Sequence, residues 1–251
     1  MMRRGAVLFV LLALTLAGCG LRGPGRREEP LETATVPPPQ APTELACIQH
    51  PMIDAWERRL RSRPYRADTR QTLRRGAAYL PRLRRILQAS GVPPSLALLP
   101  AVESSFHPEA RGKSDDRGLW QLRGATARRF GLVVTSELDD RLHPDHSTRA
   151  AARYLRLLHR RYRDWPTALA AYNAGERRID RARARRPAAS FWDLASSGQL
   201  PSRDYVPRFL AVVRMSEGVQ GCRRPVPVPP RQAEAPRPRS IRRSILTALA
   251  F

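Results

Sequence analysis

The sequence predicts a mainly α-helical fold: one domain with at most a small β-hairpin, flanked by disordered tails. Between residues 46 and 222, apolar residues recur at spacings of three and four, the period of an amphipathic helix. The only stretch that could pair as strands is a possible hairpin around residues 111–121. Residues 20–45 and 223–251 are rich in proline and too polar to bury a core. The remaining residues, 46–222, suffice for one compact domain.

The helices of this domain follow from its apolar pattern. The segments with helical period are 52–62, 69–90, 93–106, 146–163, 165–186 and 203–218. We expect Pro81 to bend the second segment and Gly91 to close it. A short helix is expected to end near Gly131. The sequence NAG at 173–175 divides the fifth segment into two helices, and Gly175 there would take a positive φ.

The N-terminus has the layout of an export signal. Arg3 and Arg4 precede an apolar run too short for an ordinary membrane span, and small residues then lead to Cys19. The sequence LAGC at 16–19 resembles a bacterial lipobox, which implies a signal peptide over 1–18 and a lipid on Cys19. Gly20, where an aspartate would favour retention in the inner membrane, favours the outer membrane. The chain is therefore expected in the periplasm, anchored by lipid at the end of a tether, 19–45; secretion without lipid is the alternative.

The net charge is +23, and Lys113 is the only lysine. Such a chain is attracted to polyanions, and a salt-sensitive polyanion binder is one possible function. However, the arginines are spread over many segments, and no nucleic-acid-binding motif is present. The prediction is that nucleic acid is not the partner.

Two cysteines lie at the ends of the predicted domain, Cys47 and Cys222. Export permits disulfides, and domain termini often lie close together, so we expect the two to pair. Two buried free thiols are the alternative. No cluster of cysteine and histidine has the spacing of a metal site, and no metal is predicted.

One acidic residue, Glu103, interrupts an apolar stretch. It follows Leu96 by seven residues and Leu99 by four, so a helix would place all three on one face. Burial beside leucines would raise the pKa of the carboxyl group and keep it protonated, as a general acid requires. A glutamate at a helix end that points into solvent is the alternative.

Three motifs occur around this residue in a fixed order: ESSFHPEA at 103–110, GLWQL at 118–122 and AYNAGE at 171–176. Together they resemble the catalytic domain of lytic transglycosylases, the lysozyme-like SLT domain related to goose-type lysozyme. Flanking stretches such as FWDL and YVPRFLAV resemble the membrane-bound subgroup D of that family. The likeness covers roughly residues 50–215.

The resemblance implies both a reaction and a set of residues. The substrate would be peptidoglycan glycan strands, cleaved without water between N-acetylmuramic acid and N-acetylglucosamine to leave 1,6-anhydro ends. Glu103 would act as general acid and then as base, and Tyr172 would donate a hydrogen bond to it. The substrate-binding residues would be Ser104, Gln121, Asn173 and Tyr205, although core packing is an equally good explanation for Tyr205 and for Trp120. No cofactor is implied, and the protein is expected to be a monomer.

The chain departs from the family pattern at two places. The loop before GLWQ, usually small and apolar, reads KSDDRG at 113–118, and Gly124 stands where the family commonly has proline. The loop also offers Glu109, Asp115 and Asp116 as a second carboxylate. Two alternative functions therefore stay open: a lysozyme-like hydrolase in which Asp115 or Asp116 orients water, and a wall-binding lipoprotein with a degenerate site.

Overall fold

The computed structural model describes residues 45–200, 203–218 and 222. The predicted signal peptide, most of the tether, Cys19 and the tail at 223–251 lie outside the described residues. The helices and strands, in chain order, are α1 (Pro51–Arg61), α2 (Tyr65–Ala77), α3 (Leu80–Ala89), the 3-10 helix η1 (Pro94–Leu98), α4 (Pro100–Glu103), β1 (Asp116–Arg117), β2 (Leu122–Arg123), α5 (Gly124–Arg129), the 3-10 helix η2 (Asp140–Leu142), α6 (Pro144–Tyr162), α7 (Trp165–Ala174), α8 (Glu176–Arg185), α9 (Phe191–Ser196) and α10 (Tyr205–Glu217).

The predicted fold class is confirmed. Within the described part of the chain, helices dominate and the one sheet is a two-stranded antiparallel hairpin. Its register pairs Asp116 with Arg123 and Arg117 with Leu122, so the first strand lies within the stretch at 111–121 where the hairpin was expected and the second lies just beyond it. Gly175 has a φ of 85° between α7 and α8, as predicted.

Two predicted helices are each divided in the structure. The segment 69–90 forms α2 and α3, because Pro81 lies in the first turn of α3, where its missing N–H costs nothing, rather than inside one bent helix. The segment 93–106 forms η1 and then the short α4, with Pro100 in the first turn of α4. The second segment ends early because Ser105 and Phe106 have positive φ values, 52° and 61°. Helix α9, which the sequence pattern did not predict, begins with a capping box between Ser190 and Asp193.

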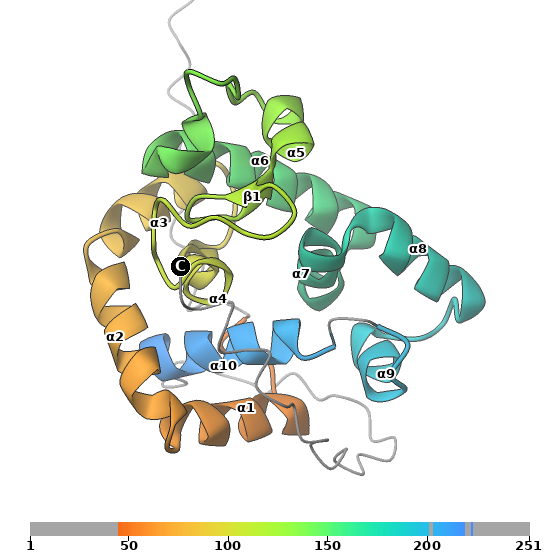
Figure 1. Cartoon of the computed structure of the whole chain (residues 1–251). Coiled ribbons are helices and arrows are strands. Elements are labelled where there is room, and N and C mark those ends of the chain that lie inside the picture. The colour runs from red at the N-terminus through yellow and green to blue at the C-terminus, as the bar shows by residue number, and fades with distance from the viewer. Residues whose placement is uncertain (1–44, 201–202, 219–221, 223–251) are drawn as a thin grey trace, which may run out of the picture. The chain divides into compact units, whose positions relative to one another are not determined.

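The long helix α6 packs against both α3 and α7, and the C-terminal helix α10 packs against α1 (Figure 1). Buried side chains from all these elements form one apolar core. A disulfide joins Cys47, just before α1, to Cys222, beyond α10, with their Cα atoms 5.4 Å apart. The two ends of the domain are thus covalently tied, next to the pair of helices α1 and α10.

Candidate active site

The site is built around Glu103, the last residue of α4. Leu96 and Leu99 on the preceding turns are completely buried, as the predicted apolar face requires. Glu103 as a whole residue is half-buried. The expected helix ends here, so the carboxyl group belongs to the last residue of a short helical turn rather than to the middle of a longer helix.

A tyrosine donates a hydrogen bond to this carboxylate, but it is not the predicted one. The hydroxyl of Tyr205, at the start of α10, donates to Oε1 of Glu103. The hydroxyl of Tyr172 instead donates to the main-chain carbonyl oxygen of Trp120, at 2.7 Å. The prediction that Tyr172 bonds Glu103 is therefore wrong in this structure. Both tyrosines nevertheless lie close enough to Glu103 for its negative charge to raise their pKa values, after burial, which is the larger cause.

Burial raises the pKa of Glu103 to about 7. The hydrogen bond from Tyr205 and the positive charge of Arg208 act in the opposite direction, and the negative charge of Asp116 adds to the rise. Desolvation outweighs the two stabilising partners, so the carboxyl group holds its proton well above the usual range of a glutamate. This is the protonation state that a general acid needs near neutral pH.

Two arginines that the sequence analysis did not identify hold α4 in place. Arg208 on α10 donates to the carbonyl oxygen of Val102 at 2.6 Å, and Arg75 on α2 donates to that of Ser105 at 2.9 Å. Carbonyl groups at a helix C-terminus lack partners within the helix, and these side chains supply them. The sequence contains a signal for Arg208, because it follows Tyr205 by three residues and so shares its face of α10.

The three motifs meet at the main-chain carbonyl groups of Leu119 and Trp120, which belong to the second motif. Ser104 of the first motif donates its hydroxyl to the carbonyl oxygen of Leu119 at 2.9 Å. Tyr172 of the third motif holds the carbonyl of the next residue, Trp120. Trp120 is fully buried and donates its indole N–H to Thr148 at 2.9 Å, so it is a core residue rather than a sugar contact. Ser104 is also buried, and its role here is to position the backbone.

The remaining predicted substrate-binding residues differ in their availability. The side-chain amide of Gln121 donates to the carbonyl oxygens of Gly118 and Ala110, at 2.8 and 3.2 Å, and so braces the loop before it. Asn173 is exposed at the end of α7 and makes no side-chain hydrogen bond with the described residues. Of the predicted set, Asn173 is therefore the polar side chain that remains available to a ligand.

The unusual charged loop has its own internal partners. Arg141, only 3% exposed, lies 2.7 Å from Asp139 and 3.2 Å from Asp115. Asp115 also accepts a hydrogen bond from the N–H of Gly124, the position where the family commonly has proline. The two departures from the family pattern thus contact each other. Gly118 must be glycine, because its φ is 76° and an added Cβ would lie 1.9 Å from the carbonyl oxygen of Arg141.

The loop also brings one carboxylate toward Glu103. Burial raises the pKa of Asp116, and its charge contributes to the raised pKa of Glu103. Asp115 is turned away to Arg141, and Glu109 is exposed. Among the three predicted candidates for a second carboxylate, Asp116 is the one that interacts with Glu103.

No group of three or more metal-binding side chains occurs among the residues that the structure describes. Nor does any helix in the described ranges have the length and apolar character needed to cross a bilayer.

The arrangement at Glu103 is that of a proton-transfer site built from a protonated carboxyl group, a tyrosine and a nearby arginine.

The chain is similar in sequence to known proteins. Residues 82–195 are similar to the family described as "Transglycosylase SLT domain", the likeness that the three motifs indicate. The match includes Glu103 and Tyr172 but ends before Tyr205 and Arg208.

Among curated proteins, the chain is similar to membrane-bound lytic murein transglycosylase D of Escherichia coli K12, with 36% identity over 126 residues. That match covers 48% of this chain and 27% of the relative. Membrane-bound lytic murein transglycosylase F of Maricaulis maris is 37% identical over 120 residues, covering 43% of this chain and 25% of the relative. The chain thus spans about a quarter of the length of these relatives.

Among solved structures, an inactive mutant of the lytic transglycosylase Slt from Pseudomonas aeruginosa is similar, with 24% identity and a TM-score of 0.48. The similarity covers 59% of this chain and 25% of that one.

Proposed function

We propose that this protein is a peptidoglycan lytic transglycosylase that uses Glu103 first as general acid and then as general base. The observation that carries the proposal is the state of Glu103: half-buried, hydrogen-bonded by Tyr205, and with its pKa raised to about 7. The SLT domain match and the curated relatives named as lytic murein transglycosylases support the same reaction class.

In the proposed reaction, the protonated Glu103 gives its proton to the oxygen between N-acetylmuramic acid and N-acetylglucosamine. The bond from C1 of the muramic acid to that oxygen breaks. The carboxylate then takes the proton of the C6 hydroxyl group, whose oxygen closes on C1 to form the 1,6-anhydro ring. The proton given in the first step is recovered in the second. Ring closure within one sugar needs no positioned water and benefits from a high effective molarity.

The surrounding residues have distinct roles in this scheme. Tyr205 and Arg208 stabilise the carboxylate formed after the first proton transfer, because both favour the charged form of Glu103. Asn173, which is exposed and follows Tyr172 in the chain, offers an amide to the acetamido groups of the sugar. We further propose that a lipid on Cys19 anchors the protein to the outer membrane facing the periplasm, with the domain acting as a monomer on the wall.

The test is a digest of purified peptidoglycan by the wild type, by Glu103→Gln and by Glu109→Gln. The Glu109→Gln variant is the matched control, since Glu109 is an exposed glutamate of the same loop region. The wild type and the control should release muropeptides with anhydro ends, detected by mass spectrometry. Glu103→Gln should release about 10²–10⁴-fold less, the usual contribution of a general acid. If Glu103→Gln leaves a biological role of the protein intact, the wall-binding alternative is favoured instead.

A lysozyme-like hydrolase is the second candidate, and the position of Asp116 favours it. Cleavage by water normally uses two carboxylates, and Asp116 interacts electrostatically with Glu103. The same digest separates the two reactions, because hydrolysis leaves reducing ends and no anhydro sugar. Predominant reducing ends that disappear in Asp116→Asn would establish the hydrolase.

A further inference from the structure

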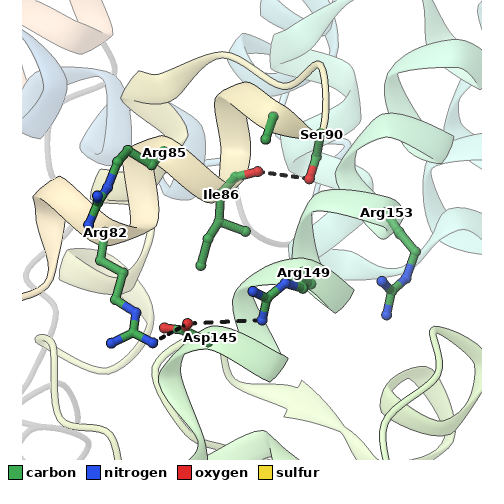
Figure 2. A pocket seen from close by; sticks show the side chains of 8 residues that line it. Arg82, Arg85, Ile86, Ser90, Asp145, Arg149 and Arg153 are labelled. Carbon is green, nitrogen blue, oxygen red and sulfur yellow. Dashed lines mark hydrogen bonds and ion pairs between the residues drawn. The ribbon is translucent and has the colours of Figure 1, made fainter. Parts of the chain in front are cut away.

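A cavity of about 440 Å³ lies between α3 and α6, and four of its eight lining residues are arginine. The side chains around it belong to Arg82, Arg85, Ile86, Ala89, Ser90, Asp145, Arg149 and Arg153 (Figure 2). None of these residues belongs to the hydrogen-bonded set around Glu103. The cavity is therefore a feature separate from the candidate active site.

The helical spacing directs the arginines to this one place. Arg82 and Arg85 are three residues apart on α3, and Arg149 and Arg153 are four apart on α6, so each pair shares a helix face. Four arginines against one aspartate leave the cavity with a formal charge of +3. Like charges at these spacings destabilise a helix rather than support it. Stability of the fold therefore does not explain why the positive charges are gathered here.

Asp145, the one carboxylate that lines the cavity, cannot form close ion pairs with all four arginines. Asp145 is buried and lies 2.6 Å from Arg82 but 3.9 Å from Arg149 (Figure 2). Arg153 donates to the carbonyl oxygen of Phe130, at 3.1 Å through Nε. Within the described ranges, Arg85 makes no hydrogen bond or ion pair through its side chain. Most of the guanidinium donors around the cavity are thus open to a ligand, because each guanidinium has five N–H groups.

We propose that this cavity, the arginine pocket of α3 and α6, binds a phosphate group. The planar fork of arginine matches phosphate oxygens with two parallel hydrogen bonds. A phosphate monoester carries roughly −1.5 to −2 charge near neutral pH, more than a single carboxylate, and the diester of a lipid headgroup carries a single negative charge, so either form complements a cavity with excess positive charge. The volume lies in the range of sites for small ligands and headgroups. The phosphate belongs either to a soluble ligand or to the headgroup of an anionic lipid.

The test compares the full chain with Arg85→Gln/Arg149→Gln. These two side chains are exposed and lie on different helices, so their removal also relieves like-charge repulsion and should not prevent folding. The control is Arg177→Gln/Arg178→Gln, which removes the same charge from exposed positions on α8. One arm measures binding of inorganic pyrophosphate by calorimetry. The other measures sedimentation with phosphatidylcholine vesicles that contain or lack phosphatidylglycerol.

The pocket variant should bind pyrophosphate, or the phosphatidylglycerol-dependent fraction of vesicles, about tenfold or more weakly than the wild type, while the α8 control stays close to it. A loss in the first arm identifies a soluble phosphate ligand, and a loss in the vesicle arm alone identifies a lipid headgroup. The proposal would be overturned if the pocket variant and the α8 control lost binding equally, or if the wild type bound neither pyrophosphate nor the vesicles. Peptidoglycan digestion should be unchanged in both variants, so the outcome is independent of the proposed function.

Discussion

Tyr205 and Glu103 are joined by a hydrogen bond although they are 102 positions apart in the chain. Glu103 ends the short helix α4, and Tyr205 begins the C-terminal helix α10. The same helix α10 supplies Arg208, which bonds the backbone of α4 at Val102. The protonation state of Glu103 therefore depends on how α10 docks, and this dependence can be tested.

Tyr205→Phe should raise the pKa of Glu103 further, because the lost hydrogen bond favours the charged carboxylate. The general acid would then stay protonated to higher pH, and the alkaline limb of the kcat/KM profile should move upward. Tyr172→Phe is the matched control, since its hydroxyl bonds the Trp120 carbonyl instead. It should lower activity without moving that limb. A shift in the Tyr172→Phe variant alone would contradict the geometry described here.

The raised pKa of Glu103 also predicts a pH-dependent cost in stability. Between the ordinary value of 4.5 and about 7, the folded protein holds a proton that the unfolded chain has lost. The contribution of Glu103 to the free energy of unfolding therefore falls as pH rises through this window, by about 3 kcal/mol. Glu103→Gln removes the ionisable group, so the variant should be more stable than the wild type above pH 7 and similar below 4.5. Urea denaturation across this range measures the difference.

Asp116→Asn should lower the pKa of Glu103, because the negative charge of Asp116 opposes ionisation of its neighbour. The alkaline limb of activity should then move to lower pH, while anhydro products remain. The adjacent Asp115→Asn is the contrast, since Asp115 is bonded to Arg141 and Gly124. That variant should lose thermal stability with no shift of the limb. A shift of the same size in both variants would show that the loop acts through its structure instead.

Gly76→Ala should destabilise the fold although alanine normally favours a helix by about 1 kcal/mol over glycine. An added Cβ would lie 2.5 Å from the ring of Phe106, which is 1% exposed and has no room to move. We expect a net loss of about 1–3 kcal/mol, typical of overpacking. The double variant with Phe106→Leu should recover part of this loss. Denaturant unfolding of both would measure it, and a more stable Gly76→Ala variant would contradict the packing.

The disulfide between Cys47 and Cys222 closes most of the chain into a loop, with 175 positions between the two residues. Cys47→Ser/Cys222→Ser should lower the free energy of unfolding by about 2–5 kcal/mol. It should also lower activity near the melting transition, because α1 and α10 lose their covalent link. Thermal unfolding with and without reductant measures the effect. Two free thiols in non-reduced peptide maps of the exported protein would rule the pairing out.

The helical fold, the catalytic candidate and the motifs around it can all be predicted from local sequence pattern. Apolar periodicity is local information, and it placed α1, α6 and α10 close to their observed bounds. The same periodicity put Glu103 on the face of Leu96 and Leu99, and burial then raises its pKa as expected. The spacing of the two cysteines at the domain ends is also visible in the chain.

Which side chains contact one another depends on how distant segments of the chain pack, and sequence pattern does not predict this. The assignment of the tyrosine on Glu103 was wrong because a motif records neighbours in sequence, whereas the bond to Tyr205 depends on how α10 packs across α4. Ser104 and Gln121 proved to brace the backbone, since burial and loop curvature set their partners. The arginine pocket likewise forms only where α3 and α6 pack together. These two helices are far apart in the sequence, so their arginines become neighbours only when the helices are in contact.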